Sequence, residues 1–430
     1  MTTEPTISAS AIDVPPIRYI DRTLANGLRV LLVPDRRVPS VAINVAYRVG
    51  GKDDPPGRSG FAHLFEHLMF KGTSRTAPET IDRLTEDVGG YNNAFTSEDI
   101  TNYYEVVPSN HLERLLWAEA DRLAALQVNA ENFATERDVV IGEYDQRILA
   151  EPYGMLDELV NREAFALHPY KRGVIGDPDQ LNAAALEDVV AFHATYYRPD
   201  NAVLVVAGDL EVEQTLRWVE RYFGAIPTPA GTVPRVRVVE PPQTAERSYV
   251  YRAANVPLAA VEEAYHIPHA AHPDAAALDV LETLLGAGRS SRLYTSLVYA
   301  QQLASSAYAT ADLREQPGLF GVRATCAGGV TLAEARAALT AELDRVRDEL
   351  AGDLELERVK TQIASAVVRS RQTHSGVALA LVRATTERGD PESVNSDLAR
   401  YLAVTAHDVQ RVAQTYLRAE NRTVIEYLPA

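Results

Sequence analysis

Cysteine and long apolar runs are nearly absent from this chain. Among its 430 residues there is one cysteine, Cys326, which can form no internal disulfide and has no second cysteine with which to bind a metal. We therefore expect Cys326 to be a buried, unreactive thiol. No apolar run approaches the roughly 18–20 residues that a membrane-spanning helix needs. The sequence thus predicts neither a disulfide-rich scaffold nor a membrane span.

Basic residues are outnumbered as well. The 42 lysines and arginines stand against 59 aspartates and glutamates, which gives a formal charge of −17. This charge makes nucleic acid and anionic membrane poor partners. Its simplest role is solubility, although part of it could line a cavity that favours basic peptides. With 46% hydrophobic and 23% charged residues, the composition is that of a soluble globular protein, and the length suggests two or three domains.

Two halves of the sequence follow the same order of patterns: a strand pair, a helix, further strands, long helices and a closing strand. Thr195–Asn201 (TYYRPDN) precedes the last strand of the first half, and the similar Thr415–Asn421 (TYLRAEN) follows 220 residues later, before the last strand of the second. Two copies of one α+β domain explain this repeat most economically. A Pro/Thr-rich stretch between them predicts domains at residues 1–232 and 246–430, joined by a linker at 233–245.

Helical periodicity places some of the longer elements within these halves. It predicts one helix over residues 183–197 and one final helix between residue 372 and the closing strand at 423–427. These two assignments depend on local pattern alone.

A His-x-x-Glu-His motif lies on the first predicted helix, residues 61–70. His63 and His67 are four residues apart, so both imidazoles leave the same face of the helix and can bind one metal ion. Glu66 is close enough to accept a proton from a water that zinc activates. The alternative is a half-buried helix with two satisfied histidines, but burying these polar groups on an apolar helix without partners is costly. The motif therefore predicts a zinc site for hydrolysis, with Glu66 as the base.

A zinc site of this kind needs a third protein ligand. The helical pattern at residues 130–149 offers Glu136 and Glu143, which are seven residues apart and thus on one face. A stripe of solvent-facing carboxylates is the alternative, and spacing alone does not choose between the two.

These motifs together resemble the pitrilysin/insulinase family of zinc metallopeptidases, the inverted zincins. The match is the HLFEH motif, followed 76 residues later by Glu143 at the end of ERDVVIGE. It is strongest with the half-length members, which look like mitochondrial processing peptidase and its bacterial relatives. The resemblance implies that His63, His67 and Glu143 bind zinc. It further implies that Glu66 activates water and that Glu136 contacts a ligand residue without binding the metal itself.

The same resemblance implies a fold and a substrate strand. The family fold consists of two similar α+β domains, each an antiparallel sheet faced by helices, which agrees with the repeat. Asn93, Ala94 and Phe95, within the segment NNAFT, look like the family's edge strand, where an extended peptide pairs through its backbone. The alternative is an ordinary strand or turn, because segments rich in asparagine are often turns.

The second half departs from the family's active pattern. Active members use an Arg/Tyr pair, seven residues apart, to hold substrate and stabilise the oxyanion, and by our alignment these positions hold Val298 and Ser305. Neither side chain supplies a cation or a phenol, and loss of such a donor costs about 10²–10³-fold in rate. We therefore expect a heterodimer in which a homologous subunit supplies the pair, and a homodimer less readily.

The sequence thus predicts a zinc endopeptidase subunit acting on peptides or unfolded segments. A non-catalytic scaffold subunit is the alternative from another class, and a presequence-processing peptidase differs only in substrate. Residues 1–16 lack the charged-then-apolar pattern of a secretory signal. The resemblance to paired bacterial members narrowly favours a soluble periplasmic protein, and the cytoplasm is expected if Met1 is the native start. A second histidine cluster, at His266, His269 and His272, fits a loop leading into the next helix better than a metal site, because no acidic or cysteine ligand lies at a fitting spacing.

Overall fold

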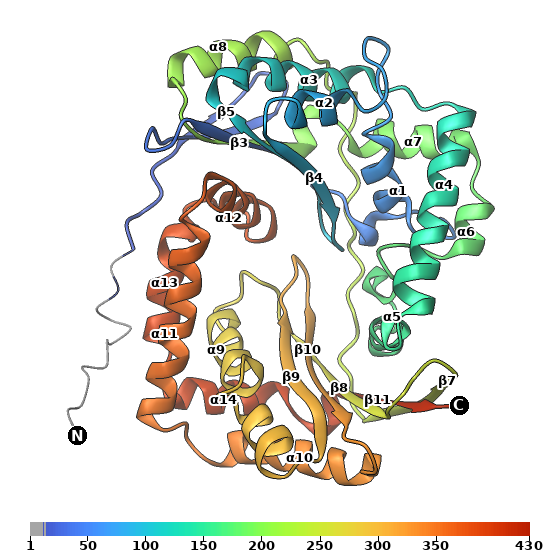
Figure 1. Cartoon of the computed structure of the whole chain (residues 1–430), viewed down its shortest axis with the longest axis vertical. Coiled ribbons are helices and arrows are strands. Elements are labelled where there is room, and N and C mark those ends of the chain that lie inside the picture. The colour runs from blue at the N-terminus through green and yellow to red at the C-terminus, as the bar shows by residue number, and fades with distance from the viewer. Residues whose placement is uncertain (1–11, 13) are drawn as a thin grey trace.

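The structure is a computed structural model that describes residue 12 and residues 14–430 (Figure 1). It contains two β-sheets, one at each end of the molecule as Figure 1 draws it, with helices around and between them. The first sheet belongs to the first half of the chain and the second sheet to the second half. Residues 224–246, which include the predicted linker at 233–245, contain no helix or strand.

The first sheet has six strands in the order β1-β2-β6-β3-β5-β4. Their bounds are β1 Ile20–Thr23, β2 Arg29–Pro34, β3 Ser40–Tyr47, β4 Tyr91–Thr96, β5 Thr101–Pro108 and β6 Ala202–Gly208. Strands β2 and β6 are parallel, and the other neighbours are antiparallel. Strand β4 therefore lies at an edge of the sheet, and β6, whose residues are all buried, lies in its centre.

The second sheet repeats this order with five strands, β7-β11-β8-β10-β9. Their bounds are β7 Arg247–Ala253, β8 Ala260–Ile267, β9 Ala304–Asp312, β10 Gly318–Cys326 and β11 Arg422–Pro429. The pair β7–β11 is parallel, as β2–β6 is in the first sheet, and the other pairs are antiparallel. Only β1 has no counterpart.

The α+β class with two related halves is confirmed, and each sheet is mixed because it contains one parallel pair. The repeated motif makes the same contact in both halves. The Asn201 side chain donates to the carbonyl of Tyr196, and Asn421 donates to the carbonyl of Tyr416, both at 2.8 Å. In each half this asparagine fixes the turn between a strand, β6 or β11, and the helix before it, α7 Leu186–Tyr196 or α14 Ala406–Tyr416.

Fourteen α-helices surround the sheets in the described residues. Those of the first half are α1 Phe61–Leu68, α2 Thr80–Glu86, α3 Leu112–Ala125, α4 Ala130–Tyr144, α5 Gly154–Ala164, α6 Pro178–Asn182, α7 Leu186–Tyr196 and α8 Val212–Phe223. Those of the second half are α9 Ala275–Gly286, α10 Leu332–Asp348, α11 Asp353–Ser370, α12 His374–Glu387, α13 Ser393–Ala403 and α14 Ala406–Tyr416. Two π-helical segments occur at Asp145–Ala150 and Tyr294–Ala300.

The helix expected over 183–197 is α7, which begins three residues later, and the short helix α6 precedes it. The prediction of one final helix was wrong, because three helices, α12 to α14, occupy its place. The N-terminus of α6 is fixed by Asp177, whose side chain accepts from the backbone of Asp179 and Gln180. Periodicity alone did not reveal this cap.

The two halves exchange one helix each. Helix α12 of the second half packs on the first sheet, where Val377, Leu381 and Val382 join a core with strand residues such as Val205. Helix α5 of the first half packs on the second sheet, where Leu156 and Leu159 meet Ala264 and Ile425. Each sheet is thus covered on one face by its own helices and on the other face by a helix from the other half (Figure 1).

A buried ion cluster also joins the halves. Lys52, only 3% exposed, lies 3.3 Å from Asp99 of the first half and 3.3 Å from Glu315, which belongs to the β9–β10 turn of the second. Burial opposes the charge on Lys52, but Asp53, Asp99 and Glu315 outweigh it and raise the lysine pKa. The turn after β9 is thereby fixed beside the segment that leads into α1.

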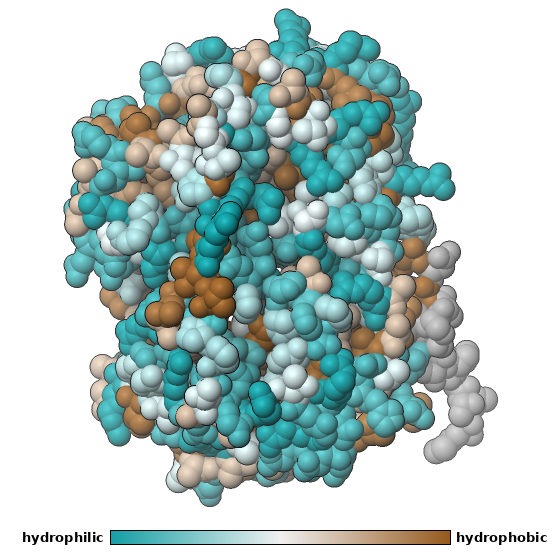
Figure 2. Space-filling view, turned by 180° about the vertical axis from the view of Figure 1, so that it is seen from behind, coloured by the Kyte–Doolittle hydropathy of each residue, from teal (hydrophilic) through white to brown (hydrophobic). Residues whose placement is uncertain are grey.

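No helix of the described residues is long and apolar enough to cross a membrane. The face drawn in Figure 2 is mainly hydrophilic, and its hydrophobic side chains gather in small, separate patches. That surface agrees with the excess of acidic residues in the sequence.

Candidate metal centre

Helix α1 holds the His-x-x-Glu-His motif in a fixed place in the core. Its side chains Phe61, Leu64, Phe65 and Leu68 are fully buried and anchor it in the core that it shares with the first sheet. The carboxylate of the buried Asp54 accepts from the backbone N–H groups of Gly60, at 2.6 Å, and Ala62, at 2.9 Å. Asp54 thus caps the helix from across the preceding loop.

The turn before α1 requires glycine. Gly60 has φ +95°, in the left-handed region, and a Cβ atom there would lie 2.6 Å from the carbonyl oxygen of Ile175. The close approach to Ile175 and Gly176 is what brings the segment before α6 against the start of the metal helix.

Helix α4 lies beside α1 and brings a carboxylate to both histidines. The Oε2 atom of Glu143 is 3.6 Å from Nε2 of His63 and 3.4 Å from Nε2 of His67. The three ligand atoms all lie within 4.8 Å of one another. Among the described residues this is the one group of three or more His, Cys, Asp or Glu side chains that could hold a metal ion.

The spacing of these three atoms fits zinc. Tetrahedral zinc with bonds of 2.0–2.1 Å separates its ligand atoms by about 3.3 Å, and the distances from Glu143 to the two histidines are close to that value. Burial, followed by the neighbouring His67, lowers the pKa of His63 to about 4, so that its imidazole is neutral. Neutral imidazole is the form that binds metals. His63 Nδ1 is buried with no hydrogen-bond partner among the described residues, and Nε2 is the ring nitrogen that faces Glu143.

Glu136 supports the second histidine from the other side. Its Oε2 is 3.4 Å from Nδ1 of His67, and its Oε1 is 2.9 Å from the ammonium of Lys71. Burial opposes ionisation, but these two contacts lower the pKa of Glu136. Burial likewise disfavours a charged His67, yet Glu136 and Glu143 raise its pKa. In the metal-free chain His67 therefore favours a proton that a metal must displace, and metal binding becomes dependent on pH.

Glu66 lies next to this group and next to the edge strand. Burial raises its pKa, and the hydroxyl of Thr96, the last residue of β4, donates to its Oε2 at 2.7 Å. A carboxylate with a raised pKa is better matched to proton transfer near neutral pH.

The predicted substrate strand is β4, and it does lie at an edge. Asn93 pairs with Tyr104, Ala94 with Tyr103 and Phe95 with Asn102, all in β5. The N–H of Ala94 donates to the side-chain oxygen of Asn93 at 2.8 Å, a local contact that a peptide carbonyl could replace. The strand therefore has a free edge that runs toward Thr96 and Glu66, although its role in binding stays a prediction.

Val298 and Ser305 occupy structural positions in the second half. Val298 lies in the π-helical segment Tyr294–Ala300 and packs against the second core, and the Ser305 hydroxyl donates to the carbonyl of Thr325. In the second histidine cluster, a ring nitrogen of His266 lies 3.0 Å from the carbonyl of Ala164, and that of His272 accepts from the backbone of Asp274. These histidines have partners other than a metal.

Two residues at the site, Lys71 and Arg147, were missed from the sequence, and Thr96 was included in the segment NNAFT without its contact to Glu66. Lys71 is four residues after His67, and Arg147 is four after Glu143, so helical spacing could have indicated both. The guanidinium of Arg147 lies 2.6 Å from Oε1 of Glu143. Thr96 gave no local signal, because its contact with Glu66 depends on the packing of β4 against α1.

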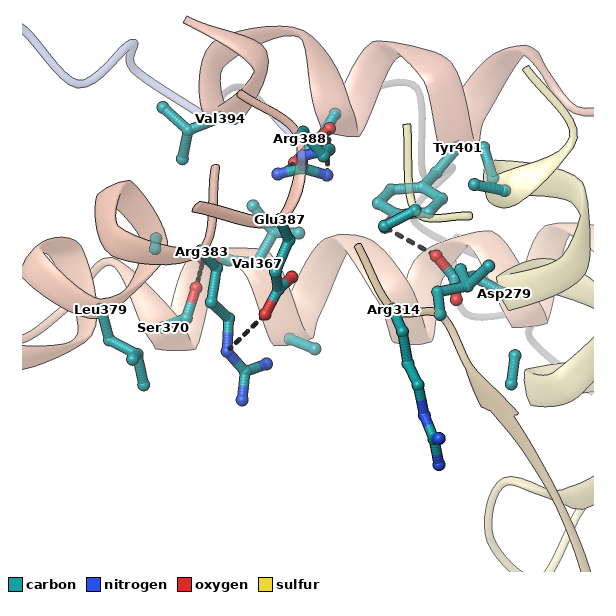
Figure 3. A pocket seen from close by; sticks show the side chains of 18 of the residues that line it. Asp279, Arg314, Val367, Ser370, Leu379, Arg383, Glu387, Arg388, Val394 and Tyr401 are labelled. Atoms are coloured by element: carbon teal, nitrogen blue, oxygen red, sulfur yellow. Dashed lines mark hydrogen bonds and ion pairs between the residues drawn. The ribbon is translucent and has the colours of Figure 1, made fainter. Parts of the chain in front are cut away.

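A large cavity lies between α9, α11, α12 and α13 (Figure 3), and it is also lined by Ser97, Glu98 and Asp99, which directly follow β4. It has a volume of about 830 Å³ and contains none of the three candidate ligands. Its charges are largely compensated: Tyr401 donates to Asp279 at 2.9 Å, and Arg383 lies 4.0 Å from Glu387 (Figure 3). It is therefore distinct from the metal centre.

The fold and the centre together define a two-domain protein with an inverted His-x-x-Glu-His metal group. The family model described as insulinase (peptidase family M16) matches residues 29–178, and the model described as peptidase M16 inactive domain matches residues 183–363. This chain belongs to peptidase family M16, the insulinase family.

Individual relatives cover almost the whole chain. "Zinc protease PqqE" of Helicobacter pylori is 30% identical over 95% of this chain and 92% of its own length. The probable mitochondrial-processing peptidase subunit beta of Arabidopsis thaliana is 27% identical over 92% of this chain and 75% of its own. The crystal structure of a protease from Helicobacter pylori matches with a TM-score of 0.92 and 29% identity, covering 95% of this chain and 99% of that one. These matches confirm the resemblance read from the motifs.

Proposed function

We propose that this chain is the zinc-bearing subunit of a metalloendopeptidase that hydrolyses peptides or unfolded segments. In this proposal His63, His67 and Glu143 hold the zinc, Glu66 is the base and Glu136 orients His67. The observation that carries it is the convergence of two imidazoles and one carboxylate on a common point, beside a second, partly buried carboxylate, that of Glu66.

The chain's own residues divide the work of hydrolysis. Zinc bound at this point would polarise a peptide carbonyl and lower the pKa of a coordinated water to about 7. Glu66, held by the Thr96 hydroxyl, accepts the proton of the attacking water and later delivers it to the leaving amine. Glu136 fixes the ring of His67 through Nδ1, which leaves Nε2 facing the metal.

Strand β4 would bind the substrate in this proposal. An extended peptide that pairs with the free edge at Asn93, Ala94 and Phe95 runs toward Thr96, whose hydroxyl contacts Glu66. Main-chain pairing gives affinity with little dependence on sequence, which suits peptides and unfolded segments. The substrate's scissile bond is thus delivered to the base by the same strand that holds the base in place.

A partner subunit completes the site in this proposal. Val298 packs in the second core and Ser305 bonds to its own sheet, so neither side chain offers a charged or phenolic donor for a developing oxyanion. We propose that a homologous subunit supplies an arginine and a tyrosine, and that a homodimer of this chain is much less active. The domain boundaries at 232 and 246 and a periplasmic location remain parts of the same proposal.

The test is co-purification from the native source, followed by metal analysis and peptide cleavage. One zinc per chain after dialysis, with cleavage that rises strongly when the homologous partner is present, supports the proposal. A chain that loses zinc on dialysis and does not cleave with any co-purifying partner would instead be the scaffold subunit. Full activity of the isolated chain would remove the partner from the proposal and leave the zinc chemistry intact.

A further inference from the structure

Arg147 contacts the carboxylate that completes the metal group. It lies in the π-helical segment Asp145–Ala150, which continues α4 directly, and it is four residues after Glu143. Its Nη1 donates to Oε1 of Glu143 at 2.6 Å, while the other oxygen, Oε2, faces Nε2 of both histidines at 3.6 and 3.4 Å. One oxygen of the Glu143 carboxylate therefore contacts the guanidinium, and the other faces the position between the two histidines where a metal would bind.

Glu143 has few other constraints. Within the described part of the chain, Arg147 is the one cation in ion-pair contact with it apart from the two histidines, and the carboxylate side chain is 22% exposed. By contrast, Glu136 is 4% exposed and is held by Lys71 as well as His67. A glutamate side chain that is free to rotate loses much conformational entropy when a metal fixes it, and a preformed contact reduces that loss.

We propose that Arg147 is a positioning residue for zinc: it holds Glu143 so that a single oxygen is presented to the metal. This inference rests on the proposed zinc site and adds to it a residue outside the ligand set. The positive charge of Arg147 also repels the metal ion, and the proposal is that the gain from orientation exceeds this repulsion. The Arg147 side chain is 68% exposed, so water and salt weaken the repulsion.

Because the Arg147 side chain is exposed, an effect on zinc binding can be told apart from an effect on folding. Exposed ion pairs contribute little to folding, so removal of Arg147 should leave the melting temperature of the metal-free chain nearly unchanged. Partners of metal ligands, however, change metal affinity about 10–100-fold. A variant at this position is therefore expected to fold normally and to bind zinc more weakly.

The experiment measures zinc affinity of the full chain by competition with a chromophoric chelator, for the unmodified chain, Arg147→Gln, Arg147→Lys and Arg137→Gln. The last is a matched control on α4, because Arg137 pairs with the exposed Asp138, which is not a candidate ligand. We expect the zinc Kd of Arg147→Gln to rise about tenfold, that of Arg147→Lys to rise less, and that of Arg137→Gln to stay unchanged. The visible spectrum of the cobalt(II)-loaded chain should also change in Arg147→Gln, because it reports the ligand geometry.

Three outcomes are distinguishable. An unmodified chain that does not bind zinc contradicts the proposed function itself. If the unmodified chain binds zinc and the zinc Kd of Arg147→Gln is lower or within twofold of the unmodified value, only the role of Arg147 is overturned. If Arg147→Gln fails to fold, the Kd and cobalt spectrum of Arg147→Lys decide, and values equal to those of the unmodified chain overturn the proposal.

Discussion

The two halves of this chain have the same strand order and use corresponding helices for different purposes. In the first half, α1 follows the central strand β3 and carries His63, Glu66 and His67. In the second half, α9 follows β8, contains no histidine and buries most of its side chains in the second core. One topology therefore serves once as a metal-binding domain and once as a supporting domain, because function depends on a few side chains grafted onto the fold.

The supporting half nevertheless shapes the metal half. It supplies α12 to the free face of the first sheet and Glu315 to the buried ion cluster around Lys52. Two residues after Lys52, Asp54 caps the metal helix. The halves therefore differ in chemistry, but each depends on the other for its structure.

The largest expected difference between the halves is in catalysis. Glu66→Gln should retain zinc and lower the rate of peptide cleavage by about 10²–10⁴-fold, because the amide cannot accept the proton of water. The measurement is zinc content together with the initial cleavage rate of the complex with its partner. The matched change on the corresponding helix, Glu282→Gln in α9, should leave the rate within a few-fold. Equal losses in both variants would contradict the division of roles between the halves.

The exchange of helices predicts that a cavity on either helix destabilises the whole chain. Leu381→Ala in α12 and Leu159→Ala in α5 should each lower the free energy of unfolding by about 2–5 kcal/mol, since both leucines are buried on the sheet of the other half. Denaturant unfolding gives the values. Leu354→Ala is the control, because Leu354 is 85% exposed, and it should change stability by less than about 0.5 kcal/mol. Two separate transitions, only one of which moves, would show that the halves are independent.

The second half contains half-buried carboxyls, Asp279 and Glu282, that should make its stability depend on pH between about 4.5 and 7. Burial, then the charge of Asp279, raises the pKa of Glu282 to about 7 from its usual 4.5. The folded chain holds this proton more tightly than the unfolded chain, so the contribution to stability is present below pH 4.5 and is lost as pH rises through 7.

The variant Glu282→Gln removes this titration. It should be more stable than the unmodified chain at pH 8 by on the order of 1–2 kcal/mol, with the difference vanishing near pH 4. Thermal unfolding over this pH range measures it. Glu349→Gln, at an exposed position, should follow the unmodified chain throughout, and a Glu282→Gln curve parallel to it would contradict the expected pKa.

The smallest effect concerns the support of His67. Lys71→Gln removes the cation that holds Glu136, and because the lysine acts through two intervening groups, the zinc Kd should rise by about three- to tenfold at most. Chelator competition measures the change, and Lys71→Arg should restore most of the affinity. A larger loss than in Arg147→Gln would mean that the indirect contact outweighs the direct one.

Much of the fold could be predicted from the sequence. The repeat of Thr195–Asn201 and Thr415–Asn421 indicated two related halves, and both segments make the same asparagine contact. The His-x-x-Glu-His spacing placed two imidazoles on one face of a helix, as the structure shows. Alternation and periodicity work in such cases because they report which face of an element is buried.

The errors in predicting helices and strands occur where contacts between residues distant in the sequence decide the structure. The three helices α12 to α14 were read as one, and α5 was not recognised as a separate helix. Helix α12 has apolar side chains on more than one face because it is buried against a sheet from the other half, so its periodicity is weak. Parallel pairing of β2 with β6 also joins strands more than 160 residues apart, which no local signal specifies.

The sequence by itself determined the class of this protein: the repeat, the metal motif and the acidic, disulfide-free character follow from residue order and helical spacing. Only the tertiary structure decided how Glu136 and Glu143 divide their contacts, with one on Nδ1 of His67 and the other on Nε2 of both histidines. It also decided that Arg147 and Thr96 contact the site. The reason is that the packing of α4 and β4 against α1 sets these distances, and that packing depends on buried side chains far from the motif along the chain.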